Sequence, residues 1–268
     1  MNTNDLRPLA VITGGSNGIG YELAKQFAQH DYDLLIAAEG AAHLAEAGQS
    51  LRATGARRVE TCPADLASEE GVAQLREAIS ALGQPVDVLC VNAGVGLGGA
   101  FVDTDLDKEI RMINLNIVGA VALTKWVLKD MVGRGRGKIL FTSSIAATMP
   151  DPFEAVYGGT KVFLRWFGES LRNELKDTGV GVTVLMPSVT DTNFFARAEM
   201  LDTRAGQMKK KDDPAVVAKA AFDGLMVDKD RVIPTLKNKA MAAGAEMMSD
   251  TVAAQVHRGL SEPGSGQS

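Results

Sequence analysis

The chain has 268 residues and a formal net charge of -5, with 46% hydrophobic and only 5% aromatic residues. This length is ample for a buried sheet covered by helices on both faces. The mild acidity argues against a nucleic-acid partner and against an anionic membrane surface. No apolar run approaches the roughly 20 residues of a membrane helix, so no membrane role is expected.

The two cysteines, Cys62 and Cys90, both lie in apolar runs. They form neither a disulfide framework nor a Cys/His metal pattern, so we expect buried thiols and no metal. The N-terminal MNTNDLRPLAVITGG has no cationic segment followed by an apolar signal core, which predicts a cytoplasmic protein.

Strand-like and helix-like stretches alternate along the first half of the chain. Short apolar runs predict strands at 9–13, 34–38, 57–62 and 86–91. Apolar residues at helical spacing predict helices from Ile19 to Ala28, from Ala41 to Ala53, and from a capping Ser68 to Leu82.

The second half repeats this rhythm. A helix is predicted over Leu106–Val132, with an interruption near Asn114–Asn116, and glycines at 133–137 end it. Further strands are predicted at 138–142, 182–186 and 231–234. Further helices are predicted at 157–176 and from Pro214, after an irregular stretch at 193–213.

The alternation predicts one α/β domain over residues 1–260, a Rossmann-type doubly wound parallel sheet of about seven strands with helices on both faces. Residues 261–268, SEPGSGQS, predict a disordered tail. The segment from Leu236 to Leu260 has three possible roles that the sequence leaves open: it covers the active site, joins an interface or caps the fold.

A glycine-rich turn, TGGSNGIG, follows the first predicted strand and precedes a helix. Glycines let the backbone turn sharply and approach a pyrophosphate, while the free N–H groups of the helix face its charge. We therefore expect this turn to bind a dinucleotide through Gly14, Ser16, Asn17, Gly18, Ile19 and Gly20.

The second strand ends in Ala37-Ala38-Glu39-Gly40. A carboxylate there can accept hydrogen bonds from ribose hydroxyls and would repel a 2′-phosphate. Glu39 therefore favours NAD, while Arg57 and Arg58 leave NADP open as the alternative.

Tyr157 and Lys161 lie four residues apart on one helix face. A nearby ammonium, together with the positive ring of an oxidised nicotinamide, would lower the pKa of the phenol from about 10 and make it a better base. Ser144 follows the fifth strand and lies at the same carboxyl edge of the sheet, where ligands bind.

With these motifs the chain resembles the short-chain dehydrogenase/reductase superfamily, in its Tyr-x-x-x-Lys subgroup, from about residue 9 to about residue 195. The resemblance implies that Ser144, Tyr157 and Lys161 are catalytic and that Asn116 holds a proton-relay water. The spacing to Tyr157 favours Ser144 over Ser143, and the following x-x-Gly favours Asn116 over Asn114. The resemblance also implies cofactor contacts from Tyr157, Lys161, Asp65, Leu66, Asn92, Ala93, Gly94, Pro187, Thr190 and Thr192.

The function implied is reversible hydride transfer between a nicotinamide cofactor and a small carbonyl compound or secondary alcohol, of modestly apolar character. Two alternatives are an NADPH-dependent carbonyl reductase of the same family and a catalytically silent nucleotide-sensing protein. The resemblance further implies a homodimer or homotetramer. Two departures from the family pattern are Ser188, where glycine is usual, and Gly158-Gly159 inside the active helix.

Overall fold

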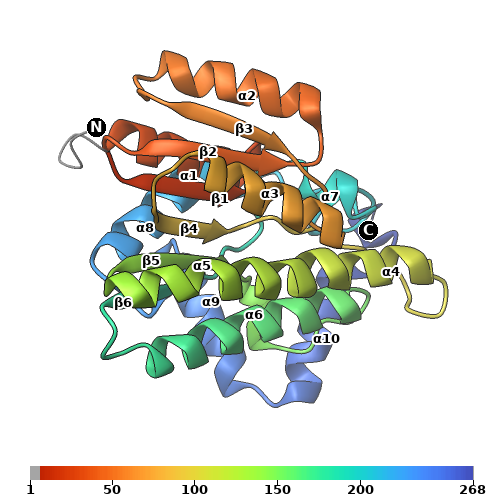
Figure 1. Cartoon of the computed structure of the whole chain (residues 1–268). Helices are drawn as coiled ribbons and strands as arrows, with labels where there is room; N and C mark the ends of the chain where they lie inside the picture. The colour runs from red at the N-terminus through yellow and green to blue at the C-terminus, as the bar shows by residue number, and fades with distance from the viewer. Residues whose placement is uncertain (1–6, 268) are drawn as a thin grey trace.

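The computed structural model describes residues 7–267. Its centre is one sheet of seven parallel strands in the order β3-β2-β1-β4-β5-β6-β7 (Figure 1). The strands are β1 (Leu9–Thr13), β2 (Asp33–Ala38), β3 (Val59–Pro63), β4 (Val86–Val91), β5 (Gly137–Thr142), β6 (Val180–Leu185) and β7 (Arg231–Val232). The predicted doubly wound parallel sheet is confirmed.

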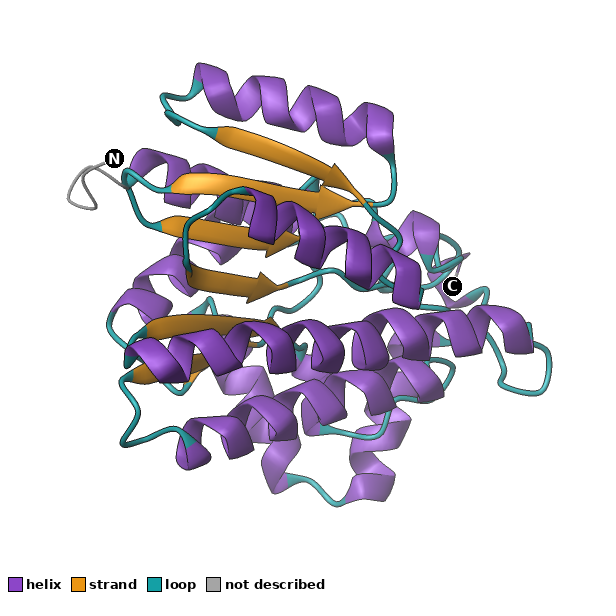
Figure 2. Ribbon diagram, viewed as in Figure 1, coloured by secondary structure: helices purple, strands orange, loops and turns teal. Residues whose placement is uncertain are grey.

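Helices cover both faces of this sheet (Figure 2). One face packs against α1 (Gly18–Gln29), α2 (Ala41–Ala53) and α8 (Pro214–Met226) through an apolar core that includes Leu23, Leu44 and Val217. The other face packs against α3 (Glu69–Ala81), α5 (Ala120–Arg134) and α6 (Ala155–Glu174) through Leu75, Val127 and Leu164. Both faces of the central strands are therefore buried, as their apolar sequences require.

Most predicted boundaries lie within two residues of those in the structure. Ser68 caps α3 as expected, because its hydroxyl accepts a hydrogen bond of 3.0 Å from the Gly71 N–H. The predicted start of α6 at Tyr157 was wrong: the helix begins at Ala155, so Tyr157 lies in its first turn. β3 begins at Val59 rather than residue 57.

The interruption predicted near Asn114–Asn116 is a π-helical segment, η2 (Asn114–Gly119), between α4 (Leu106–Ile113) and α5. Gly119 permits it to lie against the loop after β3, because a Cβ on Gly119 would be 2.2 Å from the Leu66 carbonyl oxygen. Within the described part of the chain, the continuous helix Leu106–Arg134 is the one segment long and apolar enough to cross a membrane. Its Leu123, Val127 and Met131 are buried in the core between the sheet and the helices.

After β7 the chain forms α9 (Leu236–Met247) and α10 (Asp250–Ser261), which lie behind and below α6 in the view of Figure 1. The Arg165–Glu246 ion pair joins α9 to α6. The tail expected to be disordered is instead ordered where the structure describes it. The N–H groups of Gly264 and Gly266 donate to the side chain and the carbonyl of Asp202, at 2.8 and 3.0 Å. These backbone hydrogen bonds, which composition alone does not reveal, fix the tail; Ser268 lies outside the described residues.

Candidate active site

A cavity of about 1120 Å³ lies at the carboxyl edge of the sheet, around the point where the strand order reverses between β1 and β4. It is larger than the roughly 300–1,000 Å³ of a site for one small ligand, so it has room for a dinucleotide and a substrate together. Every residue predicted to contact the cofactor lines it: Gly14, Ser16, Asn17, Gly18, Ile19, Gly20, Glu39, Asp65, Leu66, Asn92, Ala93, Gly94, Tyr157, Lys161, Pro187, Thr190 and Thr192.

The glycine turn is shaped for close backbone approach. Gly14 adopts a φ of +68°, and Gly20 lets α1 pack onto the turn, since a Cβ there would be 2.2 Å from the Gly14 carbonyl oxygen. Asn17, at the N-cap of α1, makes no side-chain capping hydrogen bond. The first N–H groups of α1 therefore face the cavity without a capping side chain, an arrangement that suits a phosphate.

Polar contacts fix the turn to β4. The Thr13 hydroxyl accepts hydrogen bonds of 2.9 Å from the N–H groups of both Asn92 and Ala93. The Asn92 amide also donates to the Thr13 carbonyl oxygen at 3.0 Å. These bonds join the two strand ends at the topological switch point, where open α/β sheets bind their ligands.

At the end of β2, Glu39 pairs with Arg111 of α4, 3.0 Å away. The same guanidinium donates two hydrogen bonds to Asp65, of 2.7 and 3.1 Å, and holds the pKa of that carboxyl below its usual value. Sequence reasoning missed Arg111 because no local motif connects α4 with the ends of β2 and β3. Arg58, considered as a phosphate ligand, pairs instead with Glu60 at 3.2 Å.

Tyr157 and Lys161 are both buried on the face of α6 that lines the cavity. The Lys161 ammonium donates to the Thr142 carbonyl oxygen at 3.0 Å and lies 5.6 Å from the centre of the Tyr157 ring. The Ser144 hydroxyl lies close enough to the Tyr157 phenol to act against the rise in its pKa. Ser143 has a different role: its hydroxyl donates to the Lys161 carbonyl oxygen at 2.7 Å and so links the end of β5 to α6.

The electrostatics of this pair differ from the expectation of a lowered tyrosine pKa. Burial raises the pKa of Tyr157, and the negative charges of Glu154 and Asp151 raise it further, against the hydrogen bond from Ser144. The two carboxylates approach the phenol from the loop before α6, where no sequence motif marks them. Burial also lowers the pKa of Lys161 to about 8.

Asn116 belongs to η2, is almost fully buried and, unlike Ser144, Tyr157 and Lys161, is not among the residues that line the cavity. Its side chain bonds the Val95 N–H (3.0 Å), the Val95 carbonyl (2.9 Å) and the Thr160 hydroxyl (3.0 Å). A Cβ built on Gly94 would lie 3.2 Å from both Asn116 Oδ1 and Lys161 Nζ. The space over Gly94 is therefore bordered by one acceptor and one donor.

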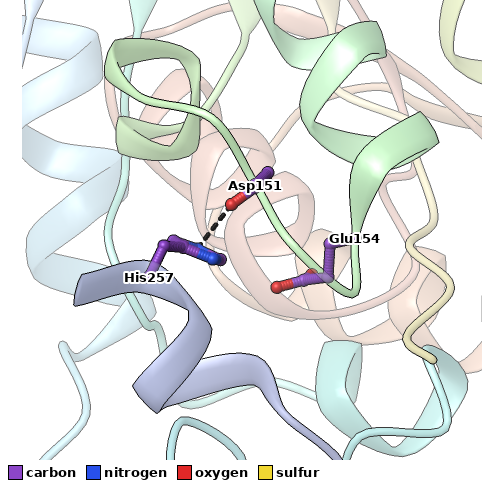
Figure 3. A group of neighbouring side chains, drawn as sticks. All are labelled: Asp151, Glu154 and His257. Carbon is purple, nitrogen blue, oxygen red and sulfur yellow. Dashed lines mark ion pairs between the residues drawn. The ribbon is translucent and has the colours of Figure 1, made fainter. Parts of the chain in front are cut away.

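Sequence reasoning also missed a buried cluster of Asp151, Glu154 and His257 (Figure 3). His257 Nε2 of α10 lies 2.5 Å from Asp151 Oδ1, and the Ser261 hydroxyl donates to Glu154 Oε2 at 2.8 Å. Glu154, His257 and Ser261 line the cavity. One donor atom from each of the three cluster residues lies within 4.8 Å of the others, so the expected absence of a metal stays a prediction.

The C-terminal segment covers the cavity, one of the three roles that the sequence left open. Met241 of α9 and Val256 and Leu260 of α10 line it, together with Met248 between the two helices. On the opposite side, Phe194 packs against the Tyr157 ring with 5.2 Å between ring centres. The substrate end of the cavity is thus mostly apolar.

Comparison with known proteins agrees with this geometry. The family model described as short chain dehydrogenase matches residues 8–201. The dehydrogenase/reductase SDR family member 7B of Bos taurus is 35% identical over 199 residues, which span 72% of this chain and 61% of that protein. The 3-dehydrosphinganine reductase TSC10B of Arabidopsis thaliana is 31% identical over 229 residues, 81% of this chain and 67% of that protein.

A solved structure with the same fold is the short-chain dehydrogenase from Sphingobium yanoikuyae in complex with NADPH. It superposes with a TM-score of 0.80 at 26% identity, over 88% of this chain and 93% of that chain. The seven-stranded sheet and its surrounding helices are therefore those of a known class of nicotinamide-dependent enzymes.

Proposed function

The chain belongs to the short-chain dehydrogenase/reductase family and is an NAD(P)-dependent oxidoreductase, and we propose that Tyr157, Ser144 and Lys161 carry its reaction. The observation that supports this assignment is the meeting of these three side chains in one cavity with the glycine turn. The nicotinamide, when bound, supplies or accepts the hydride. The substrate is a ketone or a secondary alcohol.

Tyr157 is the acid and base of this proposal. Its phenol donates a proton to the carbonyl oxygen in reduction and removes the hydroxyl proton in oxidation, while Ser144 hydrogen-bonds the same oxygen. The raised pKa of Tyr157 keeps it protonated at neutral pH, the form that reduction requires. The buried Lys161 ammonium stabilises the phenolate that forms as the proton leaves, and it also holds the nicotinamide ribose.

Asn116 and Gly94 provide the path by which Tyr157 is reprotonated. Both N–H bonds of the Asn116 amide are used within the protein, but Oδ1 also borders the space over Gly94 opposite Lys161 Nζ. A water in that space would accept from Lys161 and donate to Asn116, and so exchange protons with Tyr157 through Lys161.

NAD is the favoured cofactor in this proposal, with NADP as the alternative. Glu39 borders the end of the cavity where the adenosine ribose would lie, and its carboxylate would repel a 2′-phosphate. Arg111 could serve the NADP alternative only by leaving Glu39 and Asp65 to neutralise such a phosphate. The related structure from Sphingobium yanoikuyae holds NADPH, which keeps both cofactors in the test.

The substrate has a sizeable apolar part, because methionine, valine and leucine side chains of α9 and α10 form the wall of the cavity. The relative from Arabidopsis thaliana carries the name of a reductase for 3-dehydrosphinganine, a ketone with a long chain, which agrees with such a wall.

Assembly and location complete the proposal. The helices α4, η2 and α6 expose apolar side chains at Leu106 (67%), Val118 (52%) and Trp166 (57%). Exposed apolar side chains of this size favour burial against a second copy of the chain as a homodimer or homotetramer. We place the enzyme in the cytoplasm from its composition and its free cysteines.

The test compares NADH and NADPH on a panel of ketones, and NAD and NADP on the matching alcohols. We expect turnover that favours NADH and longer apolar substrates. Tight nucleotide binding without turnover by either cofactor would instead indicate the nucleotide-sensing alternative.

A further inference from the structure

We propose that Glu154, backed by Asp151 and His257, binds a protonated amine that the substrate carries beside its reacting carbon. The preferred substrate class is then an apolar amino ketone, or the corresponding amino alcohol. This inference rests on the oxidoreductase function proposed above and defines the polar end of its substrate.

The three side chains converge from two segments that are far apart in the sequence (Figure 3). Asp151 and Glu154 belong to the loop that leads into α6, and His257 projects from α10, which covers the cavity. Asp151 is deeply buried, with 2% of its side chain exposed, whereas Glu154 and His257 line the cavity. The cluster therefore presents Glu154 and His257 to a ligand and keeps Asp151 behind them.

Charge is unbalanced within this cluster. Two carboxylates share one imidazolium, so one negative charge lacks a counter-ion when all three groups are ionised. Asp151 Oδ2 is buried without a hydrogen-bond partner among residues 7–267. Buried charges are costly unless they are paired, so the site is completed either by an extra proton or by a cation.

Among the described residues, the groups that act on the Glu154 carboxyl include no cation besides His257. Asp151 lies on the same loop as Glu154. Tyr157 lies on α6, and His257 and Ser261 lie on α10. The neighbouring Arg258 is directed elsewhere, over the Phe153 ring at 4.9 Å and toward Glu262 at 2.6 Å. Burial and the Asp151 charge accordingly raise the pKa of Glu154 to about 7.

The position of the cluster indicates a substrate group rather than a remote ion. Glu154, at the N-cap of α6, comes three residues before Tyr157, which places the two side chains on one side of the helix, and both line the cavity. A cation held by Glu154 therefore lies near the reacting carbon, and the apolar wall from Met241, Val256 and Leu260 receives the rest of the molecule.

The test uses three alcohols of one chain length: a medium-chain secondary alcohol, the same alcohol with an amino group on the adjacent carbon, and the diol with a hydroxyl there. We expect kcat/KM for oxidation to be about tenfold to hundredfold higher for the amino alcohol than for the plain alcohol, the gain typical of a charge-assisted hydrogen bond. Glu154→Gln, which keeps the shape but not the charge, should collapse this ratio. The exposed-carboxylate control Glu262→Gln should preserve it.

Equilibrium calorimetry with the same three alcohols gives a readout that does not depend on turnover. At pH 7 the amino alcohol should bind tightest and release protons from Glu154, seen as a heat that depends on the buffer, and Glu154→Gln should remove both effects. An equal gain from the diol, or an amino preference that survives Glu154→Gln, would overturn the inference. Absence of turnover together with selective amine binding would instead reject the oxidoreductase function and retain the amine site.

Discussion

Asp151 lies so close to Gly158 that no side chain fits on the glycine: a Cβ there would be 2.5 Å from Asp151 Cβ and 2.7 Å from Asp151 Oδ2. Gly158, near the start of α6, is one of the two departures from the family pattern that the sequence showed. The structure gives the reason. Because Gly158 has no side chain, it leaves the space that the buried Asp151 carboxylate occupies behind Glu154 and His257.

Gly158→Ala should therefore displace Asp151 and disturb the polar end of the substrate cavity. We expect a loss of roughly 1–3 kcal/mol in the free energy of unfolding, typical of overpacking, despite the better helix propensity of alanine. Gly159→Ala is the matched control, because nothing lies within 4 Å of its built Cβ, and it should stabilise the helix by up to about 1 kcal/mol. Urea unfolding of both variants tests this, and equal effects from the two substitutions would contradict the assignment.

Tyr157→Phe removes the proton donor and leaves the ring that packs against Phe194. We expect kcat to fall by roughly a hundredfold to ten-thousandfold, the range of general acid–base catalysis, with cofactor affinity changed little. Single-turnover kinetics with NADH and fluorescence titration of the cofactor measure the two quantities. Near-normal turnover in Tyr157→Phe would mean that another group supplies the proton.

Gly94→Ala places a methyl group in the space bordered by Asn116 Oδ1 and Lys161 Nζ. If that space holds the relay water, kcat should fall at least about tenfold and the solvent isotope effect should rise, because proton return becomes rate-limiting. Gly133→Ala on α5 is the control, since its built Cβ meets nothing within 4 Å and it lies outside the cavity lining. An unchanged isotope effect would remove Gly94 from the proton path.

Glu39→Gln tests the choice of cofactor. Loss of this carboxylate should raise kcat/KM for NADPH relative to NADH by about tenfold, because repulsion of the 2′-phosphate is relieved and Arg111 is freed from one partner. Adding Arg111→Gln should cancel most of that gain. If the single variant leaves the ratio unchanged, Glu39 does not select the cofactor.

The parts of the fold that the sequence predicted closely are those with strong local signals. β1, α2 and β4 match their predicted bounds, because an apolar run or helical spacing is ended by glycine or a polar turn on both sides. The cofactor residues could also be predicted to lie together. The carboxyl ends of parallel strands meet at one edge of the sheet, and both the glycine turn and the Tyr157–Lys161 pair belong to that edge.

The missed residues depend on long-range packing. His257 meets Asp151 only because α9 and α10 fold back over the cavity, and nothing in the C-terminal sequence indicates that path. Arg111 reaches Glu39 and Asp65 from α4, a helix that is distant in the sequence from the ends of β2 and β3. In both cases the apolar periodicity predicts the helix but gives no sign that one of its polar residues pairs with a residue far away in the sequence.

The same cluster should make stability depend on pH. The pKa of Glu154 is raised from 4.5 to about 7, mainly by burial, so between these values the folded state binds more protons than the unfolded state. Stability from this group is therefore fully present at low pH and is lost as pH rises through 7. The raised pKa of His257 acts in the same direction.

Glu154→Gln should remove this dependence, because the amide stays neutral and can still accept the Ser261 hydrogen bond. Relative to the parent, we expect the variant to gain up to about 3 kcal/mol in the free energy of unfolding between pH 4.5 and 7.5. Urea unfolding across this range measures the difference, with Glu262→Gln as the exposed control. A difference that is flat with pH, or that shrinks as pH rises, would show that Glu154 keeps an ordinary carboxyl pKa in the folded protein.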